Sequence, residues 1–514
     1  MTDLALLGLA MLVVMIGAIF IGFPISFTLL FLALTFGYFG LGEVVFSLAY
    51  FQTIGMMKEE LLAAVPLFIF MGFITEQAGL MERLFTAFRL LLAPIRGALF
   101  AVVILTAAVF AMATGIVGAA VTVLGIMASP IMVKTGYDTR LSAGAITAGG
   151  TLGILIPPSV MLIVMGPVLG VSVADLYAAA FGPGLLLAAL YLVYLLARAF
   201  VNPKLGPPVP REERIYGIGR ILREVVLGVV PLVGLIAATL GSILAGLATP
   251  TEASGIGALG ALVLAAAYRK LTYGGLKRAV LSTTATASMV LFLAVTSNIF
   301  GAVFARMGSA NWITETMLAL NFSPVLMLIV VLLLIFLLGW PFEWPAIVLV
   351  FLPIFYPVMN ELKPALAASL GISPEMVMVW FGALVAVVLQ TAFLSPPVAM
   401  SAYYLRQVVK DWSLANIYHG MFQFMILQVL AIAMIVAFPG IATWFPDRLQ
   451  AQSRAIVTED VEGATSLEDY QPSGGYGEAL GEALEDARED AAKDEEEEGA
   501  GESRENEEAT KAGK

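Results

Sequence analysis

Long stretches of apolar residues recur along this chain from Leu4 to about Ile441, and they constrain the fold more than any other feature. Of the 514 residues, 60% are hydrophobic and only 13% are charged. An apolar helix of about 20 residues crosses the hydrocarbon core of a bilayer and satisfies its own backbone hydrogen bonds there. The sequence therefore predicts an all-α polytopic membrane protein.

Ten of these stretches are long enough to span a bilayer. They cover residues 4–22, 24–41, 61–80, 141–167, 175–197, 225–246, 252–268, 280–304, 377–405 and 420–441. Two more, 97–133 and 323–359, are longer but are interrupted by "ATGIVGAA" and "LGWPFEWPA". A segment that enters the membrane, breaks in its middle and returns is a re-entrant hairpin, so both are predicted to be hairpins.

The distribution of basic residues predicts the orientation. If both hairpins return to their own side and the N-terminus lies outside, only Lys58, Arg306 and Lys363 fall on the outer side. The other seventeen basic residues before the tail then lie on the cytoplasmic side, and an excess of Lys and Arg is typical of cytoplasmic loops. Two separate spans over 97–133 would give the same sides, so the charges support the orientation and not the hairpin. The seventeen residues on the cytoplasmic side are Arg83, Arg89, Arg96, Lys134, Arg140, Arg198, Lys204, Arg211, Arg214, Arg220, Arg223, Arg269, Lys270, Lys277, Arg278, Arg406 and Lys410.

The acidity of the chain belongs to its C-terminal tail. Residues 451–514 hold 20 of the 38 acidic and 6 of the 27 basic residues, a net charge of −14. Such a sequence has too little apolar surface to fold, so 447–514 is predicted to be a disordered acidic tail on the outer side. A solvated tail is favoured over a regulatory or docking segment.

Composition also excludes several kinds of chemistry. The chain has no Cys and only one histidine, His419, so thiolate chemistry and any metal site that needs two imidazoles are excluded. Scattered carboxylates provide no catalytic constellation, so the protein is not expected to be an enzyme. The basic, proline-rich stretch at 198–225 is interpreted as a cytoplasmic connector and not as a nucleic-acid site.

The second half of the chain resembles the first. "VPLFIFMGF" at 65–73 matches "SMVLFLAVT" at 288–296, and each precedes an amphipathic stretch and a hairpin. Because each half has an odd number of spans, the halves lie in opposite orientations, as in secondary transporters with inverted repeats. The predicted organisation is a first repeat at 1–197, a basic linker at 198–224, a second repeat at 225–446 and the tail at 447–514.

After each hairpin comes a proline pair inside a helix, in "GTLGILIPPSVM" at 150–161 and "QTAFLSPPVAM" at 390–400. Proline removes a donor and frees a carbonyl, so these breaks expose backbone groups that suit a cation or an anion. Simple kinks without a function are the alternative for one such motif, but two matched motifs favour a function. The candidate sodium and substrate contacts are Thr114, Gly115, Gly149, Gly150, Thr151, Pro157, Pro158, Gly339, Glu343, Gln390, Thr391, Ser395, Pro396 and Pro397, with Ser159, Gly118 and Trp344 nearby.

Three carboxylates lie within apolar segments, where an ionisable group is costly. Glu76 lies near a predicted helix end, and a solvated end explains it at least as well as a function. Glu252 follows "TPT" and is favoured as a helix cap. Glu343, at the second hairpin tip, is the best of the three for a cation contact or a gate.

Six motifs, in this order along the chain, resemble the large permease subunit of tripartite ATP-independent periplasmic (TRAP) transporters. The resemblance runs from about residue 5 to residue 446. The motifs are "VPLFIFMGF", "KTGYDTRLSAGAITAGGTLGILIPPS", "FGPGLLLA", "ATPTEASGIGALGAL", "FLSPPVAMSAYYLR" and "IYHGMFQFMILQVLAIAMIVAFPGIATWFP".

The resemblance implies a multi-pass protein of the bacterial inner membrane that takes up an organic anion, such as a dicarboxylate, with sodium as the coupling ion and no other cofactor. It implies two partners, a small four-helix membrane subunit and a periplasmic substrate-binding protein, and an elevator mechanism. By motif, the implied sodium contacts are Thr114, Gly150, Thr151, Gly339, Glu343 and Thr391.

Two features depart from the family pattern. Where many members have a Gly-Ser-Ser type of tip in the first hairpin, this chain reads "ATGIVGAA", which leaves Thr114 as the only hydroxyl there. The acidic tail is the second departure. The alternative function is a symporter or exchanger of related hairpin fold that needs no binding protein, and a passive channel is disfavoured because paired hairpins suit alternating access.

Overall fold

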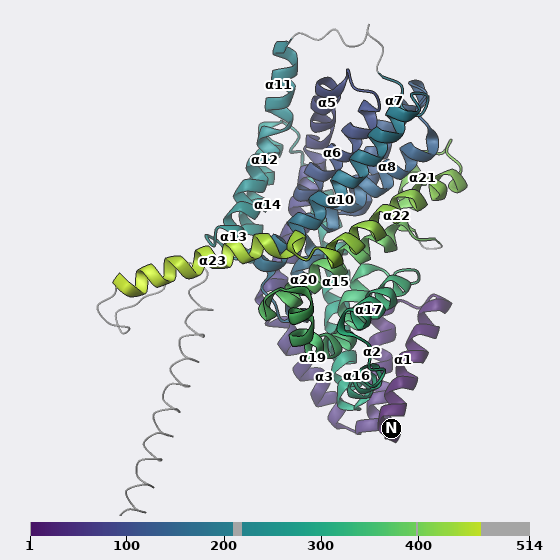
Figure 1. The fold of residues 1–514 in the computed structure, drawn as a ribbon, viewed down its shortest axis with the longest axis vertical. Coiled ribbons are helices and arrows are strands. Elements are labelled where there is room, and N and C mark those ends of the chain that lie inside the picture. Colours follow the sequence, from purple (N-terminus) through teal and green to yellow (C-terminus); the bar gives the residue numbers. More distant parts are fainter. Residues whose placement is uncertain (1, 209–217, 397–398, 464–514) are drawn as a thin grey trace, which may run out of the picture.

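The computed structural model describes residues 2–208, 218–396 and 399–463, and this part of the chain is helical with no β-strand. Ten of its helices are long and apolar enough to cross a membrane. Figure 1 shows the first hairpin in the upper half of the molecule, the second hairpin in the lower half, and α20 and α22 between them. The prediction of an all-α polytopic protein is confirmed.

The first part of the chain builds one hairpin and one broken helix. Its elements are α1 (Asp3–Ile21), α2 (Ile25–Leu41), α3 (Val44–Met57), η1 (Glu60–Ala63), α4 (Ala64–Gln77), α5 (Leu80–Leu92), α6 (Ala98–Thr114), α7 (Val117–Lys134), α8 (Thr139–Thr151), η2 (Leu152–Ile154), α9 (Val160–Leu169) and α10 (Val173–Val201). Helices α6 and α7 form the hairpin, and the break lies between η2 and α9.

The second part also contains one hairpin followed by one broken helix. Its first elements, which together are long and apolar enough to cross a membrane, are α11 (Ile218–Gly228), α12 (Val230–Ile236), η4 (Ala237–Gly241) and α13 (Ser242–Leu244). The remaining elements are α14 (Pro250–Ala267), α15 (Tyr273–Arg306), α16 (Ser309–Ala319), α17 (Pro324–Leu338), α18 (Trp344–Ala346), η5 (Ile347–Phe351), α19 (Leu352–Leu370), α20 (Pro374–Leu394), α21 (Met400–Val408), α22 (Leu414–Ala437) and α23 (Gly440–Gly463).

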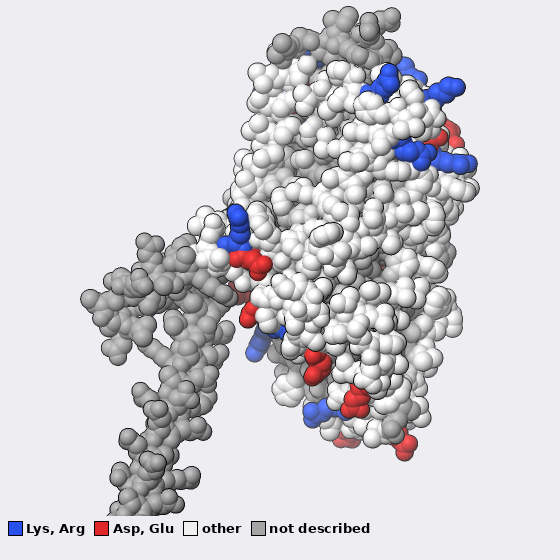
Figure 2. All heavy atoms as spheres, viewed as in Figure 1, with Lys and Arg blue, Asp and Glu red and all other residues white. Residues whose placement is uncertain are grey.

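The surface is apolar over most of its area, as expected where lipid replaces water. Large side chains such as Phe20, Phe39 and Val193 are exposed on it. Figure 2 shows Lys and Arg gathered at the upper end, acidic residues with a few Lys and Arg at the lower end, and a small mixed group at the left edge of the view.

Two features differ from the sequence-based expectations. Helix α3 (Val44–Met57) fell outside every predicted span, because at 14 residues it is shorter than a simple span. The predicted tail begins at 447, but α23 continues to Gly463, so the prediction of disorder is wrong for 447–463. Helix α23 packs against α10, where the rings of Phe445 and Phe181 are in contact, and the acidic composition of the later residues obscures this packing. Residues 464–514 lie outside the described part.

Candidate functional site

The first hairpin turns in two residues between α6 and α7. Gly115 adopts φ 60°, a left-handed conformation that glycine accepts without strain, and Ile116 completes the turn. The last residue of α6, Thr114, is buried, and its hydroxyl donates to the carbonyl of Phe110 at 3.1 Å. The tip therefore carries one hydroxyl and several backbone groups.

The first broken helix is interrupted where α8 and η2 end. Pro157 and Pro158, joined by a cis peptide bond, have no N–H to continue the ladder, and α9 starts only at Val160. Ser159 bridges the gap, because its hydroxyl donates to the carbonyl of Ile154 at 2.6 Å. Every residue from 152 to 161 is buried, so these backbone groups lie away from lipid and water.

The hairpin tip lies directly against this break. A Cβ at Gly115 would lie 3.6 Å from the carbonyl oxygen of Pro158 and 3.8 Å from that of Gly153. On its other side the tip contacts α4, since a Cβ at Gly72 would lie 2.6 Å from the carbonyl oxygen of Thr114. The structure thus brings Thr114, Gly115 and Pro158 together.

Gly149 and Gly150, which the sequence offered as ligand contacts, also have a packing role. A Cβ at Gly149 would lie 3.1 Å from the Cβ of Ala107 in α6. A Cβ at Gly150 would lie 2.3 Å from Cγ2 and 3.1 Å from the backbone nitrogen of Val121 in α7. The two glycines allow both arms of the hairpin to lie against α8.

The second hairpin has a longer tip, which covers Gly339 to Glu343 between α17 and α18. It approaches the second broken helix at Gly339, where a Cβ would lie 3.0 Å from the Cβ of Ala392. Glu343 is exposed. A dehydrated cation needs buried ligands, whereas Glu343 lies at an open edge of the tip.

The second break follows α20, which ends at Leu394. Thr391 and Ser395 are buried, and their hydroxyls donate to the carbonyls of Val388 at 2.6 Å and Thr391 at 2.7 Å. Pro396 is exposed, whereas Pro397 lies outside the described residues. The nitrogen and the oxygen of the Gln390 carboxamide are both buried and have no hydrogen-bond partner in the described part of the chain.

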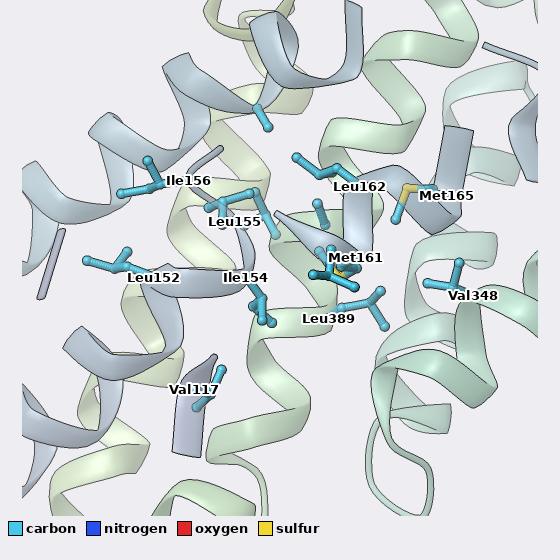
Figure 3. Packing of buried hydrophobic residues seen from close by; sticks show 14 of the residues in the cluster. Val117, Leu152, Ile154, Leu155, Ile156, Met161, Leu162, Met165, Val348 and Leu389 are labelled. Carbon is cyan, nitrogen blue, oxygen red and sulfur yellow. The ribbon is translucent and has the colours of Figure 1, made fainter. Parts of the chain in front are cut away.

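The two half-sites meet across an apolar layer in the centre of the protein. Figure 3 shows Ile154 and Met161 of the first broken helix near Leu389 of α20, with Val348 of the second hairpin beyond them. Helix α20 contacts both η2 and α9, and α9 also contacts η5. The breaks are therefore parts of one central region although they are far apart in the sequence.

The buried hydroxyls share one geometry. Those of Thr114, Thr151 and Thr391 each donate to a carbonyl of their own helix, Thr151 to Ala148 at 2.8 Å. A hydroxyl that has used its proton in this way presents only oxygen lone pairs to a further partner. Together with carbonyls freed at the breaks, these oxygens suit a hard cation that prefers oxygen ligands.

The other ionisable candidates have structural explanations. Glu252 closes a capping box with Thr249, which confirms the cap: the Thr249 N–H donates to Glu252 Oε2 at 2.8 Å, and the Glu252 N–H donates to Thr249 Oγ1 at 3.2 Å. Glu76 lies in the last turn of α4, half-buried. His419 is exposed, with Nδ1 2.7 Å from the carbonyl oxygen of Ala415.

Sequence reasoning missed three residues near the site. The ring of Tyr404, in α21, lies against Gly118 of the first hairpin, where a Cβ would be 3.0 Å from it. Tyr191 and Gln428 lie behind the first break, and the polar neighbours of Tyr191 are the side chains of Gln428 and Thr151. Their positions in apolar helices were visible in the sequence, but only packing brings Tyr191 next to Thr151 and Gln428.

The chain is similar to known transporter permeases over most of its length. Residues 12–441 match the family model of the tripartite ATP-independent periplasmic transporter, DctM component. The chain is 28% identical to the C4-dicarboxylate TRAP transporter large permease protein DctM of Rhodobacter capsulatus, over 83% of this chain and 96% of that protein. It is also 28% identical to the sialic acid TRAP transporter large permease protein SiaM of Vibrio cholerae, over 84% and 96%.

Two solved structures share the fold. The YdaH transporter of Alcanivorax borkumensis has a TM-score of 0.53 at 17% identity, over 79% of this chain and 90% of that one. MtrF of Neisseria gonorrhoeae has a TM-score of 0.53 at 15% identity, over 77% and 84%. The apolar helices and these relatives indicate a multi-pass inner-membrane protein. With a family match across nearly all of its membrane region, the chain belongs to the DctM family of TRAP transporter large permeases.

Proposed function

We propose that this permease couples the inward movement of sodium to the uptake of an organic carboxylate through the two half-sites. The observation that carries the proposal is the contact of each hairpin tip with a broken helix, at Gly115 beside Pro158 and at Gly339 beside Ala392. Tips and breaks placed in this way concentrate backbone dipoles at the centre of an apolar protein, which is the usual setting of a transport site.

Sodium fits the oxygen atoms available in this region. The hydroxyls of Thr114, Thr151 and Thr391 have lone pairs free, and carbonyls such as those of Gly153 and Pro158 face the first tip. These residues would hold sodium as a transported ion. Because the ligands are neutral, binding is expected to be weak enough for release on the inner side.

The carboxylate is proposed to face the helix starts that follow the breaks. Neither α9 nor α21 has a side chain that caps its first turn. The leading N–H groups of such a helix attract anions, through hydrogen bonds and through the helix dipole. The nearby sodium ions would add to this attraction and make substrate affinity depend on sodium.

We infer an elevator mechanism from the contacts of the two hairpins. Helices α4 and α15 contact each other, α4 contacts α6, and α15 contacts α18 and η5. In the proposal α4 and α15 belong to a scaffold, and the hairpins move past them with the broken helices. The division into repeats at 1–197 and 225–446, with a linker at 198–224 and a tail at 447–514, remains part of this proposal.

The substrate is proposed to be a C4-dicarboxylate or a related organic acid. The two relatives named above are equally similar to this chain, and their names indicate a C4-dicarboxylate and sialic acid. Both substrates are carboxylates, which is the feature that an uncapped helix start and sodium would recognise. We further propose a small four-helix membrane subunit and a periplasmic binding protein as partners, and transport without enzymatic chemistry.

Reconstitution tests the proposal. The permease is placed in proteoliposomes with its membrane partner, and uptake of radiolabelled succinate and sialic acid is measured with and without the binding protein. Uptake should require both an inward sodium gradient and the loaded binding protein. Uptake that needs neither would refute the mechanism, and sodium-dependent uptake without the binding protein would favour a symporter or exchanger that works alone.

A further inference from the structure

Two pairs of tyrosine and glutamine face each other across the interface of α10 and α22, and they differ in their hydrogen bonding. In the outer pair, the hydroxyl of Tyr194 donates to Oε1 of Gln423 at 2.5 Å. In the inner pair, nearer to the first break, Tyr191 has the side chains of Gln428 and Thr151 as its polar neighbours. Neither Tyr191 nor Gln428 makes a side-chain hydrogen bond of normal geometry to any described residue.

The inner pair is completely enclosed. Tyr191, Gln428 and Thr151 are each 0% exposed, and the ring of Phe424 packs edge-on against Tyr191 at 5.1 Å. A carboxamide carries two donor hydrogens and an acceptor oxygen, and burying these without partners is unfavourable. In folded proteins such groups are paired with protein or with ordered water.

The position of Gln428 links this cluster to both breaks. Two contacts hold α22 against α20, Trp380 Nε1 to the carbonyl of Ile435 at 3.3 Å and the hydroxyl of Ser395 to Sδ of Met425 at 3.2 Å. Gln428 lies between these contacts along α22, and α22 also packs against α8. The cluster is therefore behind the end of α8 and next to the helix that carries the second break.

We propose that Tyr191 and Gln428 hold a buried water beside Thr151 and position the end of α8 through it. The Thr151 oxygen has two lone pairs, so one can accept from this water while the other stays available to the proposed sodium. Between Tyr191 and Gln428 water fits better than sodium, because the two side chains present amide and hydroxyl donors as well as acceptors. A bridging water also explains why the inner pair lacks the direct hydrogen bond of the outer pair. The positioning role rests on the proposed sodium coupling, whereas the water site does not.

X-ray hydroxyl-radical footprinting of the detergent-purified permease, read by mass spectrometry, tests the water site. Radicals formed from bound water modify adjacent side chains even when these are buried. Tyr191 should be modified, whereas the control Tyr177, also 0% exposed but donating its hydroxyl proton to the carbonyl of Ser159 at 3.4 Å, should not. Equal protection of both tyrosines would overturn the proposal. Protection of Tyr191 by sodium chloride, but not by choline chloride, would assign the site to a cation and overturn it as well.

Uptake measurements test the positioning role. Gln428→Leu should lower the modification of Tyr191 and raise the sodium concentration for half-maximal uptake by about 3-fold to 10-fold, with a smaller change in the maximal rate. Gln423→Leu, at the outer pair, is the matched control and should leave both unchanged. An unaltered sodium dependence in Gln428→Leu would remove the positioning role. If uptake by the unaltered protein does not depend on sodium, the proposed function is refuted. The modification of Tyr191 in the footprinting experiment still shows whether the buried water is present.

Discussion

The two pairs of hairpin and broken helix have the same order of elements but differ in packing. In the first, a two-residue tip at Gly115 and Ile116 lies on a fully buried break, and Gly150 leaves no room for a side chain against Val121. In the second, the tip is longer and partly exposed, and Gln390 precedes Thr391 where Gly150 precedes Thr151. The first pair is fixed by close packing, and the second offers more polar groups.

This difference predicts what substitutions will change. A larger side chain in the first pair should disturb folding before it disturbs binding, because interiors are close-packed and overpacking forces neighbours to move. Polar substitutions in the second pair should act mainly on ion and substrate dependence. The three experiments below test this contrast.

The largest effect is expected for Gly150→Val. Its Cβ would lie 2.3 Å from Cγ2 of Val121 and 3.1 Å from the backbone nitrogen of the same residue. Overpacking of this kind costs about 1–3 kcal/mol, so the thermal unfolding midpoint in detergent should fall clearly. The control is Gly255→Val in α14, where a Cβ meets nothing within 4 Å. Equal midpoints for the two variants would show that the first pair is not tightly packed.

An intermediate effect is expected for Thr391→Val, which keeps the shape of the side chain but removes the hydroxyl oxygen. If that oxygen binds sodium, the sodium concentration for half-maximal uptake should rise roughly tenfold, which corresponds to about 1.4 kcal/mol. Thr151→Val tests the equivalent position of the first pair in the same assay.

Thr147→Val is the matched control for both variants. Its hydroxyl is also buried and donates to a helix carbonyl, that of Ala143 at 2.8 Å, but it lies about one turn before the end of α8. Its sodium dependence should not change. If Thr391→Val and Thr151→Val behave like this control, neither hydroxyl is a sodium ligand.

The smallest effect is expected for Glu343→Gln. The carboxylate is exposed, and an exposed charge acting over about 10 Å in water contributes about 0.4 kcal/mol. The half-maximal sodium concentration should therefore rise only about twofold, with no change in the unfolding midpoint. Glu361→Gln, on the exposed surface of α19, is the control. A change of tenfold or more would mean that Glu343 becomes buried against sodium during transport.

The candidate site could be predicted from the sequence to different extents. The tips and breaks were predicted correctly, because glycine and proline act on the backbone where they stand. The structure brings Thr114 and Gly115 to Pro158, and Gly339 to Ala392. The packing role of Gly150 was not visible, since it depends on Val121, which belongs to another helix.

Hydrophobic length, the two interrupted apolar stretches and the two proline motifs determined, by themselves, a polytopic membrane protein with two hairpins and two broken helices. These are local properties, because each segment must satisfy the bilayer and its own backbone separately. Tertiary structure decided the rest: the docking of α23, the exposure of Glu343 and the enclosure of Tyr191 and Gln428. Burial and the loss of a hydrogen-bond partner depend on which helices pack together, and no pattern within one helix specifies its neighbours.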